Sequence, residues 1–230
     1  MGRGSVEPVD DVRVDNPTSN PELLQYLGDD LVAADYDLRH LYRQILNSTT
    51  YQLACVPSDA DAAADEHFAY YQTRRLDAEV LIDAICQITG TTETYMSIIP
   101  EPYTFLPEQQ RAISLPDGSI TSSFLELFGR PPRDTGLASE RNNRLTPGQA
   151  LHLINSNHIR RKIREGPAIQ ELLSGVSDSH QICERIYLTV LSRRPNEQEL
   201  HIASQLCDFS HGQRDLIWTL INSDEFLFQH

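Results

Sequence analysis

The sequence predicts an all-α fold: an irregular multi-helix domain with long proline-rich loops and little or no β-structure. Three observations predict this fold. Apolar residues recur three and four positions apart through much of the chain, the spacing that places them on one face of a helix. Good N-cap residues precede many of these stretches, and glycines close several of them. Prolines gather in the segments between.

The first half of the chain contains three strong helical patterns. One begins at Asn20-Pro21, because asparagine is a good N-cap and proline suits the first helical position. The others follow Asp37 and Asp77, and a short helix is expected around residues 65–72. The residues expected to form the buried faces of the three helices are Leu23, Leu24, Leu27 and Leu31; then Leu38, Leu41, Tyr42, Ile45 and Leu46; then Val80, Leu81, Ala84, Ile85 and Ile88.

Residues 91–120 are expected to be irregular, because they contain several prolines and an Asp117-Gly118 turn. Long segments of this kind tend to be binding loops, lids or linkers. The rest of the chain is predicted as helices at 122–128, from Thr146-Pro147 onward, at 178–192, at 197–208 and at 213–222, with a last turn at 224–229. We predict one domain over residues 1–230, in which 1–90 and 121–230 can form sub-lobes joined by 91–120.

An apolar pair followed by Asn-Ser occurs three times, and each time an apolar residue follows the asparagine by four positions. This pattern predicts a helix that ends at asparagine and a serine that caps a new turn, whose apolar residue folds back onto the core. We favour a recurrent helix corner over a shared ligand site. The three segments are 45–51, 153–159 and 220–226.

Composition and charge narrow the class of protein. Hydrophobic residues make up 40% and charged residues 23% of the 230 residues, which fits a globular chain rather than a disordered one. The formal net charge of −14 repels phosphate backbones, so no nucleic-acid partner is predicted. No apolar stretch approaches the ~20 residues that cross a bilayer, and no signal region begins the chain. The four separated cysteines are interpreted as buried apolar side chains, with a disulfide left open.

One basic run, His158 to Arg164, stands out in this acidic chain. Its isoleucines, Ile159 and Ile163, are four positions apart and can face a core together. We favour a solvated basic helix face over a site for a polyanion.

Three groups of residues are candidates for chemistry or binding. Glu7, Asp10 and Asp11 could act as acid and base or hold a cation, but a loop in which they cap backbone groups and pair with Arg13 is favoured. A proline-stiffened loop with nearby arginines suits an oxyanion, and the favoured alternative is an arginine–glutamate network that pins the loop. Its residues are Arg130, Arg133, Glu140, Arg141 and Arg144.

The third group is His152 and His158, which flank the corner at Asn155-Ser156. His152 and Asn155 are candidate ligand-binding residues, although a helical histidine is more often structural. No two histidines have the i,i+4 spacing of a helical metal pair, and no cofactor or metal site is predicted. The chain also lacks GxSxG, Walker, GxGxxG and HExxH motifs.

Taken in order, short segments along the whole chain resemble the planctomycete-type domain of unknown function 1553. They are residues 2–13, Asn16-Pro17, 20–24, 36–38, 47–52, Arg74-Arg-Leu-Asp-Ala-Glu79, 115–118, Phe128-Gly-Arg-Pro-Pro-Arg133, 149–155 and 218–228. The resemblance implies the C-terminal module of a larger secreted, periplasmic or cell-envelope protein, often with a cytochrome c-like domain. The family has no established activity, so it supplies no catalytic residue.

Two departures from the family pattern matter. The chain opens inside the family motif, which predicts an N-terminally truncated product. Leu137 and Ser139 stand where relatives often have Cys-x-Cys.

The leading hypothesis is a non-catalytic module that binds a protein or glycan, or serves as a scaffold, within an envelope-associated multidomain protein. Its expected partners are other domains or proteins of that system, and its expected contact surface is residues 1–13 and 129–144. One alternative is a carboxylate-based hydrolase of polysaccharides that uses Glu7, Asp10 or Asp11 with Glu140. Another is an accessory to a haem electron-transfer domain.

Overall fold

The structure is a computed structural model that describes residues 4–9, 11–56, 68–97, 99, 103–116, 118–131, 140–142 and 144–229. The described chain is essentially all-α, which confirms the predicted fold class. Its contacts form two compact units. The N-terminal unit comprises the described residues up to Arg74 together with Glu140, and the C-terminal unit comprises Arg75–Gln229 apart from Glu140. The single domain over residues 1–230 stays a prediction.

The N-terminal unit contains two helices that pack against each other, α1 (Pro21–Ala33) and α2 (Leu38–Leu46). Both begin where the sequence predicts. Proline occupies the start of α1, and the Asp37 carboxylate accepts a hydrogen bond from the Arg39 amide at 2.9 Å at the start of α2.

Two expectations for this unit were wrong. Neither α1 nor α2 has a buried residue, and the Leu23 and Leu24 side chains of the expected buried face are 41% and 48% exposed. Two short helices have too little surface between them to enclose a core. The short helix expected at 65–72 is absent over 68–72, because Phe68 has a φ of 52°, outside the right-handed helical region. Residues 65–67 lie outside the described ranges.

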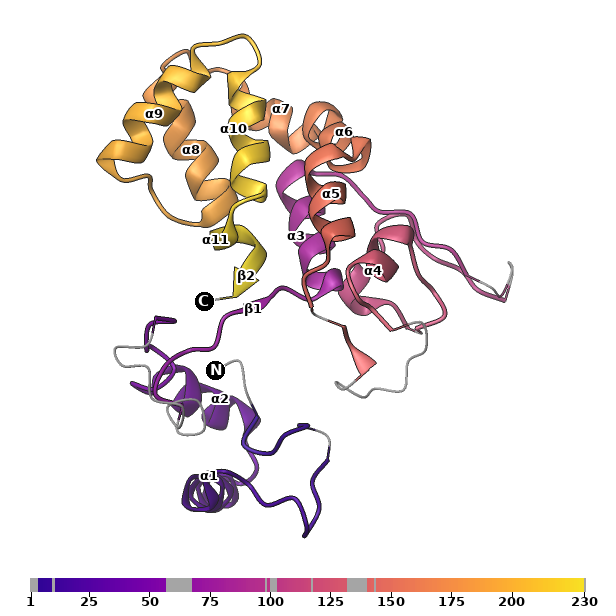
Figure 1. Ribbon diagram of the computed structural model, residues 1–230, viewed down its shortest axis with the longest axis vertical. Helices are drawn as coiled ribbons and strands as arrows, with labels where there is room; N and C mark the ends of the chain where they lie inside the picture. Colours follow the sequence, from indigo (N-terminus) through magenta and orange to yellow (C-terminus); the bar gives the residue numbers. More distant parts are fainter. Residues whose placement is uncertain are drawn as a thin grey trace. The chain divides into compact units, whose positions relative to one another are not determined.

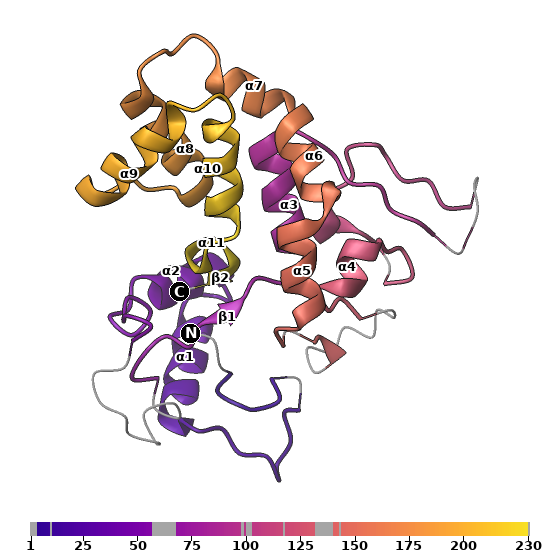
Figure 2. The same ribbon diagram turned by 45° about the horizontal axis from the view of Figure 1, so that its top comes forward.

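The C-terminal unit contains most of the helices (Figures 1 and 2). After the short strand β1 (Arg74–Arg75), these are α3 (Ala78–Thr89), the 3-10 turn η1 (Ala112–Ser114), α4 (Ser123–Leu127), α5 (Pro147–Asn155), α6 (Asn157–Glu165), α7 (Pro167–Leu173), α8 (Ser179–Leu191), α9 (Glu197–Cys207), α10 (Gly212–Ile221) and α11 (Asp224–Leu227). Strand β2 (Phe228–Gln229) pairs with β1.

One apolar core holds the C-terminal unit together. Helix α3 packs against α4, α6, α7 and η1, while α8, α9 and α10 lie side by side, as Figure 1 shows. Helix α10 also contacts α6, so it joins the two groups. The largest fully buried side chains are Phe124, Phe128, Leu81, Ile82, Ile85, Leu125, Ile159, Ile169, Ile186, Ile217 and Ile221.

Local signals in the sequence set the helix boundaries. Thr146 with Gln149 forms a capping box at the start of α5, and Asn196 with Glu199 forms another at the start of α9. Gly129 follows α4 with a φ of +93°, and a β-carbon there would collide with the Asn142 carbonyl. These caps confirm the predicted starts of α5 and α9 and the predicted end of α4.

The three Asn-Ser segments are helix corners, as predicted. The Ser48 and Ser223 hydroxyls each donate at 2.7 Å to a carbonyl of the preceding helix. Ser156 caps α6 by accepting from the His158 amide at 3.0 Å. Of the apolar residues that follow, Ile159 and Phe226 are buried, while Tyr51 is half-buried.

Replacing Ser156 with alanine is expected to lower the free energy of unfolding by about 1 kcal/mol, because the α6 cap is lost. Urea unfolding followed by circular dichroism measures this change. Exposed Ser174, which ends α7 rather than starting a helix, supplies the control S174A. An S156A variant as stable as S174A would contradict the capping role.

Candidate functional site

The acidic candidates of the N-terminal loop are engaged by near neighbours. The Glu7 carboxylate accepts from the Gly4 amide at 3.2 Å, and the Asp11 carboxylate accepts from the Arg13 guanidinium at 2.9 Å. Asp10 lies outside the described residues. These contacts match the favoured loop interpretation, and a catalytic role for Glu7, Asp10, Asp11 or Glu140 stays a prediction.

The predicted arginine cluster is organised by a carboxylate that the sequence did not single out. Glu79 of α3, with its side chain 5% exposed, receives two hydrogen bonds from Arg141 at 2.8 and 3.0 Å and an ion pair from Arg130 at 3.2 Å. Burial alone raises the pKa of Glu79, but the hydrogen bonds and charges of the two arginines outweigh it and lower the pKa. Glu79 therefore pins the segments that follow α4. Arg133 lies outside the described residues.

His152 lies in an aromatic environment at the end of α5. Its ring is 5.7 Å from Phe124, 5.9 Å from Phe128 and 5.6 Å from His158, measured between ring centroids. Burial lowers its pKa, so the neutral ring is favoured. Asn155, by contrast, is exposed. Binding roles for both residues stay predictions.

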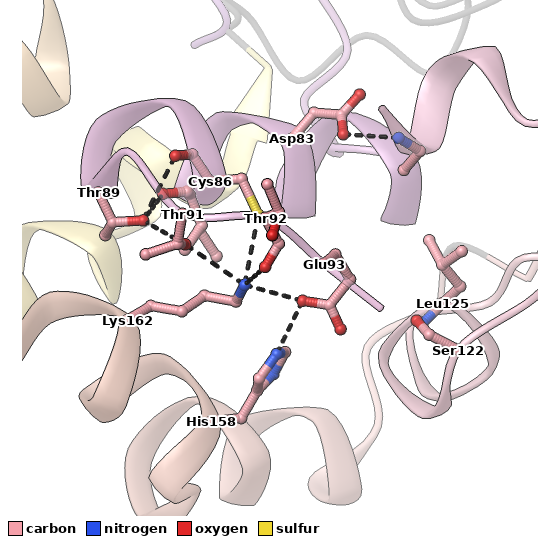
Figure 3. A network of polar contacts seen from close by, with 12 residues as sticks. Asp83, Cys86, Thr89, Thr91, Thr92, Glu93, Ser122, Leu125, His158 and Lys162 are labelled. Atoms are coloured by element: carbon pink, nitrogen blue, oxygen red, sulfur yellow. Dashed lines mark hydrogen bonds and ion pairs between the residues drawn. The ribbon is translucent and has the colours of Figure 1, made fainter. Parts of the chain in front are cut away.

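A buried polar network joins α6 to the segment after α3 (Figure 3). The Glu93 carboxylate lies 2.9 Å from the His158 imidazole and 3.0 Å from the Lys162 ammonium. Lys162 also donates to the Thr92 carbonyl at 2.6 Å and to the Cys86 sulfur at 3.4 Å. Burial raises the pKa of Glu93, but the His158 and Lys162 contacts lower it more. Because the Lys162 side chain is only 7% exposed, its ammonium group interacts with groups inside the protein rather than with solvent.

A cavity of about 260 Å³ lies beside this network and is walled partly by the predicted irregular segment 91–120. Its lining includes Cys86, Glu93 and Tyr95. Burial and the neighbouring Asp83 raise the pKa of Tyr95. Asp83 itself accepts the amides of Ala112 and Ile113 at 2.7 and 3.1 Å, so it holds η1 in place. The two carboxylates that line this cavity, Asp83 and Glu93, are thus both engaged in contacts within the protein.

The opposite side of α6 borders a groove of about 490 Å³ against α10, which we name the α6–α10 groove. It is lined by the cations Arg160, Arg164 and Arg214, the apolar side chains Ile163, Leu206 and Trp218, and the polar residues His211, Asp215 and Thr219. Its volume lies in the range of small-ligand sites, roughly 300–1,000 Å³. Three arginines and one aspartate line the groove, so this surface is basic although the chain has a net charge of −14.

Charged and aromatic side chains meet in the α6–α10 groove. The Arg160 guanidinium lies 5.4 Å from the centre of the Trp218 ring, in a cation–π contact. The Arg214 Nε and the Trp218 indole N–H are buried and have no hydrogen-bond partner among the described residues. The start of α10 adds its own positive end, with His211 at the N-cap. The groove therefore combines positive charge with apolar side chains.

A larger cavity of about 820 Å³ lies within the N-terminal unit, between α1 and α2. Apolar or neutral side chains such as Leu23, Tyr26 and Ile45 line it. Of its two basic side chains, His40 bonds to Asp30 at 2.9 Å and Arg43 carries a single positive charge. It lacks the convergent cations of the α6–α10 groove.

Sequence reasoning identified the basic run but not its two-sided arrangement. His158 and Lys162 are four positions apart and share one face, while Arg160 and Arg164 share another. This spacing can be read directly from the sequence. The partners Glu93, Trp218 and Arg214 come from distant segments, and no local pattern pointed to them.

Comparisons with known proteins place this chain in a family. A family model described as "PSD1: Protein of unknown function (DUF1553)" matches residues 1–207. The chain belongs to the DUF1553 family. The match includes α6 and ends before α10, so the family segment supplies one wall of the groove. No curated protein matches. No solved structure matches.

Two further findings concern the described part of this DUF1553 chain. None of its helices has the length and apolar character that spanning a membrane requires. No group of three or more histidine, cysteine, aspartate or glutamate side chains there could hold a metal ion.

Proposed function

We propose that this DUF1553 chain is a non-catalytic binding module of an envelope-associated multidomain protein, and that it captures short anionic glycan segments in the α6–α10 groove. The convergence of three arginines beside Trp218 carries the proposal. Guanidinium groups recognise carboxylate and sulfate oxygens through paired N–H donors, and an indole supplies apolar contact for a sugar ring.

The rest of the molecule limits the size of the ligand. A long polyanion would be repelled by the acidic chain. A segment of two or three sugars interacts mainly with the cations of the groove, because more distant charges are screened. The groove volume of about 490 Å³ suits such a segment.

The test uses the full chain and trigalacturonic acid, with neutral maltotriose as the matched sugar. Trp218 is the only tryptophan, so its fluorescence reports this groove alone. We expect the acidic sugar to change the fluorescence and to bind more weakly as salt rises, because rim charges are screened. Maltotriose should give no change at the same concentration.

Two variants locate the ligand. R160Q and R214Q are each expected to raise the dissociation constant, measured by calorimetry, about tenfold, which corresponds to roughly 1.4 kcal/mol. R161Q removes the same charge from an exposed position of α6 that does not line the groove, and it should bind like wild type. Equal weakening by R161Q, equal binding of maltotriose, or tighter binding of hexaglutamate would overturn the glycan assignment.

The described residues support no second function. The Asp11 carboxylate is paired with Arg13, and Glu79 is paired with Arg130 and Arg141. No contact among the described residues favours the hydrolase or the haem-accessory alternative.

A further inference from the structure

Two cysteines meet in the core between α8 and α9. Cys183 of α8 is 0% exposed and Cys207, the last residue of α9, is 4% exposed. The Cys183 thiol donates to the Cys207 sulfur, with 3.4 Å between the two sulfurs. All four cysteines are free thiols in this structure.

Both thiols are placed for a covalent bond. A disulfide needs a sulfur–sulfur distance of roughly 2.05 Å, so the sulfurs must approach by roughly 1.4 Å. Side-chain rotation within two packed helices can supply a movement of that size. The other cysteines are occupied elsewhere: Cys86 contacts Lys162, and Cys55 belongs to the N-terminal unit.

We propose that Cys183 and Cys207 become a disulfide when the chain folds under oxidising conditions. One S–S bond forms and two S–H bonds break. The two electrons and two protons pass to the disulfide of an oxidant such as oxidised glutathione, which becomes two thiols. The exchange runs through a mixed disulfide between one cysteine and the oxidant.

The bond must form before the core closes. Exchange requires a thiolate, and burial raises the pKa of Cys183 to about 12 and also raises that of Cys207. In the folded chain both sulfurs are buried from solvent, so oxidants reach them poorly. The same burial protects the finished disulfide from reductants.

The disulfide would fix the end of α9 to α8. Leu206, next to Cys207, lines the α6–α10 groove, and the chain then turns into α10. The bond would also close a loop between residues 24 positions apart, which restricts the unfolded chain. The proposal stands independently of any ligand in the groove.

The experiment refolds the full chain with oxidised glutathione or with dithiothreitol, then alkylates free thiols and maps tryptic peptides by mass spectrometry. We expect the oxidised sample to contain a Cys183–Cys207 cross-linked peptide pair, with Cys55 and Cys86 alkylated. Its Tm should exceed that of the reduced sample by on the order of 10 °C.

Two variants separate the outcomes. The C55A/C86A variant should keep both the cross-link and the Tm difference. The C183A/C207A variant should lose the Tm difference between the two samples. Full alkylation of Cys183 and Cys207 after oxidative refolding, or cross-links of either to Cys55 or Cys86, would overturn the proposal.

Discussion

Replacing Glu79 with alanine is expected to lower the free energy of unfolding by about 3 kcal/mol, because it removes the buried carboxylate that pairs with Arg130 and Arg141. Arg130 is 8% exposed and would lose its ion pair with Glu79, while Arg141 is 34% exposed and can regain water. Because Arg141 is partly exposed, the expected loss of stability lies at the lower end of the range for breaking a buried ion pair. Urea unfolding of the full chain, followed by circular dichroism, measures it.

The pH dependence of this difference tests its ionic origin. The folded state lowers the pKa of Glu79, so the stabilisation is fully present above the ordinary pKa of glutamate, about 4.3. It is lost as the pH falls through the lower folded-state value. The difference in unfolding free energy between wild type and E79A should therefore stay constant between about pH 6 and pH 8. It should shrink in stronger acid. The exposed residue Glu171 supplies the control E171A, for which a loss as large as that of E79A would contradict the argument.

Replacing Lys162 with methionine is expected to lower the free energy of unfolding by about 3–5 kcal/mol. Methionine keeps the length of the stem but removes the ammonium, so the Thr92 carbonyl and the Glu93 carboxylate lose a donor. Glu93 is 10% exposed and would retain only the His158 contact among its two ion pairs. Denaturant unfolding at neutral pH gives the change.

A double substitution distinguishes lost charge pairing from lost packing. If the charge pair is the cause, K162M/E93Q should be less destabilised than the sum of K162M and E93Q, because no unpaired charge remains. Exposed Arg161, on the same helix, provides R161M as the control, with an expected change within ±0.5 kcal/mol. Additive single and double effects would show that Lys162 acts by packing alone.

Local patterns predicted much of the fold. The starts of α1, α2, α5 and α9 and the Asn-Ser corners follow from caps and apolar spacing, because those interactions join residues within a few positions of one another. Ionic partners were not predictable in this way. Glu79 and Arg141 are 62 positions apart, and Glu93 and His158 are 65. Helical periodicity shows which residues share a face, but it does not say what that face meets.

The candidate site shows the same limit. The run from His158 to Arg164 was visible as basic and helical, but a single solvated face was the favoured interpretation. The structure instead pairs half-buried His158 and buried Lys162 with Glu93, and it places Arg160 and Arg164 along the groove. Trp218 lies on α10, beyond the reach of any local pattern. In the N-terminal unit, the apolar spacing of α1 predicted a buried face, but that pattern could not show that α2 is too small to cover it.

Different faces of helix α6 make different kinds of contact. Successive residues turn by about 100°, so the two isoleucines separate the internal charges from the groove arginines, and Arg161 points elsewhere. Under the proposed function, substitutions at positions 160 and 164 would change what the groove binds while leaving the interior contacts of α6 in place. The structural contacts and the proposed binding contacts are thus carried by different residues of one nine-residue helix, so each can be altered without the other.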